Sequence, residues 1–236
     1  MKKTIVALVA VSCAAAVFAQ QNNRRNRGPA PMPGAEGAVT QGRDAKVLVD
    51  QFPKTGQASA LSAPVLQGQT TIGKCYQKPR KWLVFEMKYT TFVKWQDQLT
   101  FTWHILLESK SATEKDRADD KAPYSYYTTS VTYSNIPQGS HAASVVLPPS
   151  ILERYGYAKA IGVVISNKNG DVLGGQSESE VKGIESGSQW WNNNDIMDAK
   201  DTKTGGMMIE RRQGLLERSK TIWGLVNPND YEMVEM

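Results

Sequence analysis

The sequence predicts a mainly β fold, a two-layer antiparallel immunoglobulin-like sandwich with one short helix and a C-terminal extension. Three observations predict it. Apolar and polar residues alternate along several segments, an Asn-Gly pair gives a tight-turn signal, and Pro and Gly bracket one short helical stretch. The chain has 236 residues, 40% of them hydrophobic, which is enough for one good core.

The clearest strand is predicted in residues 99–107, where every odd position is large and apolar. Thr100, Thr102 and His104 occupy even positions, so we expect one buried face and one solvated face, with His104 on the solvated face. Residues 83–89 repeat the alternation. Further β-rich runs span 125–136, 143–147 and 158–166, and Asn169-Gly170 predicts a hairpin turn before a last strand, DVLGGQSES.

A short helix is predicted between two of these strands. Pro148 and Pro149 stand at its start and Gly156 at its end, an arrangement typical of one or two helical turns. In a sandwich, such a turn carries the chain from one layer to the other. Residues 210–220 fit either a short helix or an edge strand, because periodicity does not separate the two.

Residues 1–19 have the layout of a cleavable secretory signal peptide. Two lysines precede a short apolar stretch that ends in Val17-Phe18-Ala19, which predicts cleavage between Ala19 and Gln20. A retained membrane anchor and a lipid on Cys13 are the alternatives. We therefore expect an exported protein in the periplasm, the outer membrane or at the cell surface.

The exported chain divides into three predicted parts. Residues 20–44 are rich in Asn, Gln, Arg, Pro and Gly and poor in large apolar residues, which predicts a flexible lead. Residues 45–182 hold the predicted sandwich. Residues 183–236 form an extension of different texture, which we expect to pack back on the sandwich because its apolar residues would otherwise be exposed together.

The cysteine and charge counts limit what the exported chain can bind. Cys75 is its only cysteine; we interpret it as a small buried residue, with an intermolecular disulfide or a reactive thiol as alternatives. The full chain has 28 basic and 23 acidic residues, but five of the basic ones precede Gly28. From there on the two signs balance at 23 each, so we expect no nucleic-acid partner.

The inventory of reactive groups favours a protein without catalytic activity, cofactor or metal. The chain has two histidines, His104 and His141, and none of the spacings of metalloproteases, serine hydrolases or paired Cys/His metal sites. The charged run 114–121 alternates Lys and Arg with its acids, so it is a poor calcium site and predicts a solvated loop.

The most suggestive surface signal is a group of apolar residues in a polar run of the extension. Trp and Met are enriched where proteins meet, so these residues are our candidate contact site. A sugar-binding site is the second interpretation, because rings stack on Trp and amides bind hydroxyl groups. A third is that the tryptophans only anchor the extension. The candidate residues are Trp190, Trp191, Ile196 and Met197, and Asn192, Asn193 and Asn194 supply the amides.

The overall pattern resembles a known kind of protein. The signal peptide, the Pro/Gly lead, the strands KWLVFEMKYTTF and WQDQLTFTWHILLES, and the ending LLERSKTIWGLVNPNDYE carry the resemblance. Together they resemble a secreted immunoglobulin-like protein encoded beside type IV pilus assembly genes in mucus-dwelling gut bacteria. This resemblance implies an outer-membrane or surface protein associated with a pilus system, and it supplies no catalytic residues.

We therefore expect a non-enzymatic exported protein that acts by protein–protein contact, accessory to a type IV pilus system or the cell surface. Its expected partners are other pilus-assembly or outer-membrane proteins and the host surface. A carbohydrate-binding module that recognises host mucin glycans is the alternative.

Overall fold

The computed structural model describes residues 47–57, 59–62, 80–109, 122–202 and 205–225. All of them belong to one compact unit, Gly37–Met236. Several sequence predictions lie outside the described residues: the signal peptide and its cleavage site at Ala19 and Gln20, the lead 20–44, Cys75 and the charged loop 114–121.

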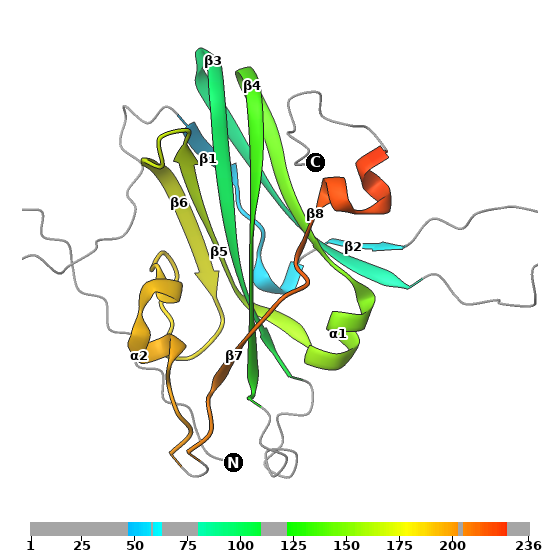
Figure 1. The fold of residues 1–236 in the computed structure, drawn as a ribbon, viewed down its shortest axis with the longest axis vertical. Helices are drawn as coiled ribbons and strands as arrows, with labels where there is room; N and C mark the ends of the chain where they lie inside the picture. The colour runs from blue at the N-terminus through cyan, green and yellow to red at the C-terminus, as the bar shows by residue number, and fades with distance from the viewer. Residues whose placement is uncertain (1–46, 58, 63–79, 110–121, 203–204, 226–236) are drawn as a thin grey trace, which may run out of the picture. The chain divides into compact units, whose positions relative to one another are not determined.

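The described strands form one mainly antiparallel sheet (Figure 1). Its central order is β6-β5-β3-β4-β7, while β1 and β2 also pair with β3, and β8 pairs with β4. The β4–β7 pair is parallel, so the sheet is mixed rather than purely antiparallel as predicted. The strands are β1 Val47–Gln51, β2 Ser59–Ser62, β3 Lys81–Glu108, β4 Tyr124–Leu147, β5 Tyr157–Asn167, β6 Val172–Ser179, β7 Ile209–Arg212 and β8 Leu216–Glu217.

Helices are short and few in the described residues. The α-helices are α1 Pro149–Tyr155 and α2 Asn194–Met197, and the 3-10 helices are η1 Thr55–Gln57, η3 Trp190–Asn192, η4 Arg218–Lys220 and η5 Ile222–Leu225.

The two longest strands each combine two of the predicted ones. Residues 83–89 and 99–107 are both parts of β3, and residues 125–136 and 143–147 are both parts of β4. The two strands pair along nearly their whole length, with one interruption. Between Thr91 and Trp95, β3 advances four residues while β4 advances two, which is a large β-bulge.

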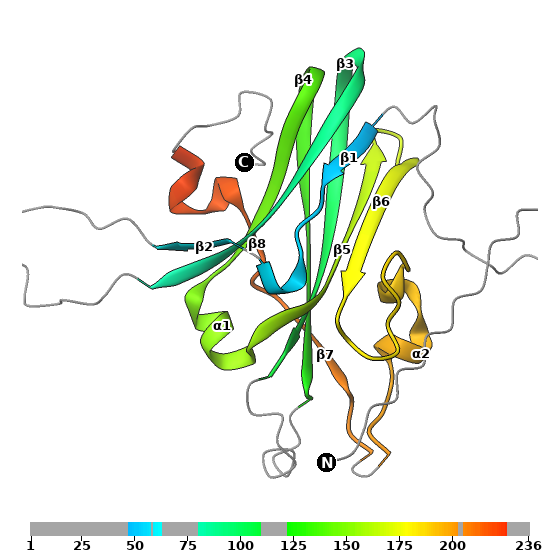
Figure 2. The same ribbon diagram turned by 180° about the vertical axis from the view of Figure 1, so that it is seen from behind.

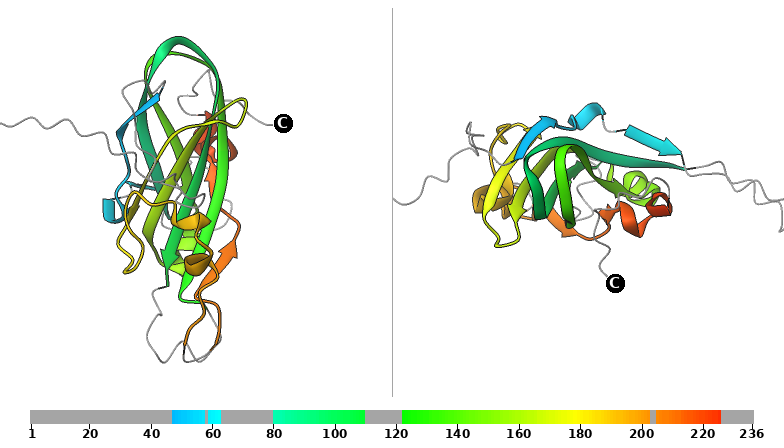
Figure 3. Two further views of the ribbon diagram at one scale, coloured as in Figure 1. Left: turned by 90° about the vertical axis from the view of Figure 1, so that its left-hand side faces the viewer. Right: turned by 90° about the horizontal axis from the view of Figure 1, so that it is seen from above.

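At this bulge both long strands fold back on themselves. Tyr89 and Phe101 would lie about 40 Å apart in a straight strand, yet their ring centroids are 4.8 Å apart. In β4, the backbone N–H of Ser144 donates to Tyr133 Oη at 3.4 Å across a similar separation in sequence. Figure 3 shows the two strands arching over at this end.

The fold-back gives the sheet two layers. One layer holds the start of β3 and the end of β4 with β1, β2 and β8; the other holds the remaining halves with β5, β6 and β7. Figure 2 shows β1 and β2 along β3 in the first layer. The odd-numbered apolar residues of β3, Phe85 to Tyr89 and Leu99 to Leu107, enter one core between the layers, so the predicted buried face is confirmed.

Backbone geometry in β4 and one buried hydroxyl hold the bend. Asn135 has φ 56° and Gly139 has φ 139°, conformations that a straight strand does not use. On β3, the buried Thr91 Oγ1 donates to Pro137 O at 2.7 Å. The bend therefore depends on turn-forming residues in the partner strand, whereas β3 itself has neither Gly nor Pro.

The predicted helix is confirmed as α1. Pro148 caps its start in an extended conformation, and Gly156 ends it with φ 91°. It connects β4 of the first layer to β5 of the second, and Ile151 enters the core between them. Within the ambiguous run 210–220, the chain forms the strands β7 and β8 followed by η4, and no α-helix.

Candidate functional site

The outer face of the second layer carries a second, smaller hydrophobic cluster. Leu106, Tyr126 and Ala160 point outward from β3, β4 and β5, and residues 181–200, here called the cover segment, pack on them. Trp190 and Met197 are the central side chains that the cover segment contributes. The even-numbered face of β3 is therefore dry at this end of the sheet, although the sequence predicted a solvated face.

His104 lies under the cover segment and is 8% exposed. The Trp191 ring stacks on its imidazole, with centroids 4.2 Å apart and planes at 3°. A hydrogen bond of 2.6 Å joins His104 Nδ1 to Tyr126 Oη. The prediction that His104 is solvated was wrong, because the ring that covers it, Trp191, lies more than eighty residues further along the chain. Burial lowers the pKa of His104 from 6.5 to about 3.

Gly162 makes room for the Trp191 ring. It lies opposite His104 on β5, and a Cβ there would come within 2.0 Å of Trp191 Cζ3. The missing side chain lets the indole lie flat on the sheet, an arrangement known from other glycines in strands. Trp191 is thus held by close packing on two neighbouring strands.

The structure brings the four predicted contact residues together but exposes them unequally. Trp190 is 1% exposed and Met197 is 3% exposed, and both belong to the outer cluster. Trp191 and Ile196 are half-buried at its edge. Their role in binding stays a prediction, and the structure restricts the accessible part of the site to Trp191 and Ile196.

The neighbouring amides are exposed but partly engaged. Asn192 Nδ2 donates to Gln189 Oε1 at 2.8 Å. Asn193 Oδ1 accepts from the backbone N–H of Asp195 at 2.9 Å, which caps the start of α2. Two of the three amides that the sequence offered to a sugar are therefore used to order the cover segment itself.

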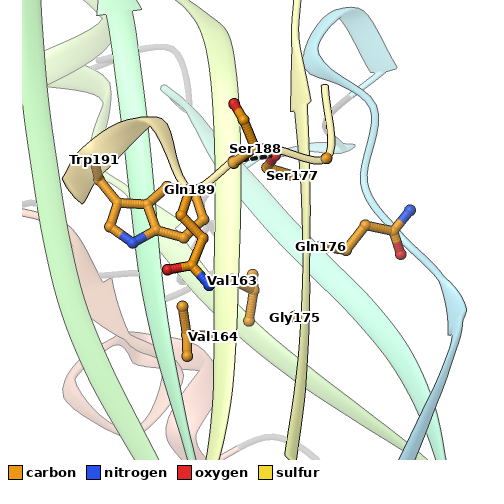
Figure 4. A pocket seen from close by; sticks show the side chains of 9 residues that line it. Val163, Val164, Gly175, Gln176, Ser177, Ser188, Gln189 and Trp191 are labelled. Atoms are coloured by element: carbon orange, nitrogen blue, oxygen red, sulfur yellow. Dashed lines mark hydrogen bonds between the residues drawn. The ribbon is translucent and has the colours of Figure 1, made fainter. Parts of the chain in front are cut away.

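A shallow pocket adjoins Trp191 where the cover segment meets β5 and β6 (Figure 4). Its wall includes Val163, Gly175 and Gln189, and Ser177 Oγ donates to Ser188 O at 2.7 Å beside it. The space is about 10 Å³, close to what one water molecule occupies. A sugar ring does not fit into it.

Three sequence signals pointed to this covered face and were missed. Leu106 is apolar at an even position of β3, and Tyr126 is a large aromatic residue on the same face of β4. Apolar residues on both faces of neighbouring strands indicate that something covers both. Gly162 within a run of apolar residues was a third signal of close approach.

The described residues hold neither a candidate metal site nor a candidate membrane-spanning helix. They contain no group of three His, Cys, Asp or Glu side chains placed to hold a metal ion. They also contain no helix long and apolar enough to cross a membrane.

The comparison with known proteins gives a family. No curated protein matches the chain. A crystal structure of a protein from Akkermansia muciniphila matches with a TM-score of 0.57 and 22% sequence identity, covering 81% of this chain and 94% of that one. At this identity the likeness shows the fold alone. A family model matches residues 42–222, which is well over half of the chain, and the chain therefore belongs to the family that this model describes.

Proposed function

We propose that this is a non-enzymatic exported protein that acts by protein–protein contact, accessory to a type IV pilus system or to the cell surface. Its proposed partners are pilus-assembly or outer-membrane proteins. The observation that carries the proposal is the surface around Trp191 and Ile196. There, an apolar edge is held rigidly on a sheet rather than set in a pocket.

Rigid aromatic anchors suit protein contact. Trp191 is fixed by its stack on His104 and by the gap at Gly162, so binding would order few side chains, and little conformational entropy would be lost. Tryptophan is also among the residues that carry most binding energy at interfaces. Ile196, partly buried against the same cluster, adds to the apolar edge.

The immunoglobulin-like class of the fold belongs to the same proposal. The two layers, the core between them and the crossing by α1 support it. Its difference from a standard sandwich is that two long strands run through both layers.

The glycan-binding alternative has less support. Asn192 and Asn193 already use their amides within the cover segment, and the pocket beside Trp191 is the size of a water molecule. A glycan site would have to be built from two groups only, the outer ring face of Trp191 for stacking and the amide of Asn194 for hydrogen bonds.

A photo-cross-linking residue at position 196, introduced in the native cell, tests the proposal. We expect covalent adducts with a pilus-assembly or outer-membrane protein, and none from the same residue at Lys182, which is exposed elsewhere in the cover segment. Adducts of equal yield from both positions would contradict a specific contact. Binding of soluble mucin glycans that is lost in Trp191→Ala would instead favour the alternative.

A further inference from the structure

A second candidate surface lies along the open edge of the strand β2, Ser59–Ser62. β2 pairs antiparallel with residues 81–84 at the start of β3, and no backbone hydrogen bond joins its other edge to a described residue. All four of its residues are exposed, and Figures 1 and 2 show it at the margin of the first layer. A row of backbone N–H and C=O groups is therefore open to solvent along this edge.

The other edge strands have features that hinder the addition of a further strand. β1 and β6 pair with their neighbours through register shifts, and the cover segment already occupies part of the β6 edge, where the N–H of Gly187 donates to Ser177 O at 3.0 Å. β7 is mostly charged, and β8 is two residues long. Irregularity, charge and shortness protect sheet edges from pairing. β2 pairs in regular register, has no charged residue and contains no Pro.

An apolar shelf stands beside this edge on the outer face of the first layer. Leu61 is 41% exposed and lies directly opposite Trp82 on β3. The ring of Trp223, from η5, meets Trp82 edge-on with centroids 5.1 Å apart. We call Leu61, Trp82 and Trp223 the shelf. On the other face of β2, Ala60 pairs with Leu83, which packs against the main core. An apolar side chain added on either face would therefore meet apolar atoms.

The length of the edge restricts the kind of partner. Four strand residues span about 13 Å, whereas a stable interface between folded proteins buries about 1,200–2,000 Å² in total. The edge is too short for such an interface, including one between two copies of this chain. A single extended segment uses the edge fully, because its backbone pairs with β2 and its alternate side chains reach the shelf.

The charges near the edge do not select a charged segment. β2 itself is uncharged. Arg80 Nε donates to Glu153 Oε1 at 3.2 Å, so this charge is already paired. The exposed Lys81 lies opposite Ser62 on β3, one strand away from the open edge. An uncharged segment therefore fits this edge best.

We propose that β2 binds an extended, uncharged segment of a partner protein by strand addition, with an apolar side chain of that segment beside Leu61 on the shelf. The bound segment extends the first layer by one strand. Main-chain hydrogen bonds supply the affinity, and the shelf selects an apolar residue at one position. This surface is separate from the contact site at Trp191 and Ile196, which lies on the second layer.

Binding of labelled hexapeptides to the mature chain, measured by fluorescence anisotropy, tests this proposal. The parent probe alternates Thr and Val, and we expect it to bind. Two further probes carry N-methyl groups on one or the other set of alternate amides. One of them should bind roughly tenfold more weakly, because its methyl groups replace the donors that face β2, and the other should bind like the parent. A probe with Lys in place of Val should also lose roughly tenfold.

A variant of the shelf gives a second measurement. Leu61→Ser should weaken binding of the parent probe by roughly tenfold. Leu48→Ser is the matched control, because Leu48 is 37% exposed on the edge strand β1, and its loss should change nothing. The N-methylated probes need no variant, so they test the proposal even if Leu61→Ser folds poorly.

Three results with the probes would overturn the proposal: no binding of the parent probe, equal affinity of the two N-methylated probes, or equal affinity of the wild type and Leu61→Ser. So would a dimer in sedimentation equilibrium that Leu61→Ser abolishes, because a second copy of this chain would then be the occupant. None of these outcomes bears on the contact site at Trp191 and Ile196.

Discussion

Two pairs of aromatic residues in this chain differ in their exposure to solvent. Trp190 and Trp191 stand next to each other in a polar run and look like an exposed binding feature, yet Trp190 is buried and Trp191 is stacked on His104. Phe92 and Trp95 lie in a strand whose sequence shows no sign of a binding feature, yet the side chains of both are more than half exposed.

The difference comes from the surfaces that the two pairs meet. The cover segment lies on Leu106, Tyr126 and Ala160, an apolar patch that would otherwise face water. Phe92 and Trp95 stand at the bend of β3 and β4, opposite a run in which Asn135 and Gln138 are exposed, and neither ring belongs to a hydrophobic cluster of the described residues. An aromatic residue is buried where another element supplies its partner, so its immediate sequence neighbours do not decide its exposure.

The largest expected effect is the loss of Trp190. Trp190→Ala should lower the free energy of unfolding by about 3–5 kcal/mol, the range for emptying a buried aromatic site. Trp190→Phe should cost much less, because Trp190 Nε1 is buried without a hydrogen-bond partner among the described residues. Denaturant unfolding of both variants checks this. A cost below about 1 kcal/mol for the alanine variant would mean that the cover segment is loosely held.

Gly162→Ala should destabilise the protein by about 1–3 kcal/mol, as overpacking does. The added methyl group would collide with Trp191 Cζ3 and lift the indole off the sheet. Gly174→Ala on β6 is the matched control, because a Cβ there meets nothing within 4 Å. A double-mutant cycle with Trp191→Ala should show that the cost of Gly162→Ala nearly vanishes once the ring is gone.

Acid should weaken the attachment of the cover segment through His104. Its pKa is about 3 in the folded chain and 6.5 in the unfolded one, so below pH 6.5 the unfolded chain binds a proton that the folded chain does not. Stability is therefore present above pH 6.5 and falls towards pH 3, by up to about 1.4 kcal/mol per pH unit. We expect the loss between pH 7 and pH 5 to be smaller in His104→Gln. Equal losses in both proteins would show that His104 is not the group responsible.

Local alternation predicted much of the fold. The odd-numbered core face of β3, the helix α1 and the turn before β6 all followed from short-range patterns and are confirmed. The joining of the predicted strands into β3 and β4 could not be seen in the same way. The bulge adds an even number of residues, so the alternation of β3 keeps its phase through the bend.

The candidate site was harder to predict because its parts are distant in sequence. The solvated face assigned to His104 failed since Trp191 covers it, and no local pattern relates residue 104 to residue 191. The exposure of Phe92 and Trp95 could not be predicted from the sequence for a related reason. Asn135 and Gly139, which bend β4, lie forty or more residues from Phe92 and Trp95.

The smallest expected effect is the loss of the exposed rings of Phe92 and Trp95. Phe92→Ser and Trp95→Ser should each change the free energy of unfolding by less than about 0.5 kcal/mol, as surface substitutions usually do. Their rings lie outside both hydrophobic clusters of the described residues, so little packing is lost when they are removed.

Thr91→Val, at the neighbouring position, is the contrasting variant. It removes the hydroxyl that donates to Pro137 O at a buried site, and we expect a cost of about 0.5–1.5 kcal/mol, the usual net value of one hydrogen bond, because Pro137 O keeps His141 Nε2 at 2.8 Å. If Trp95→Ser proved the more damaging of the two, the ring would be holding the bend. If Thr91→Val is the more damaging, the bend does not depend on the rings, and the hydrogen bond to Pro137 O rather than aromatic packing holds it.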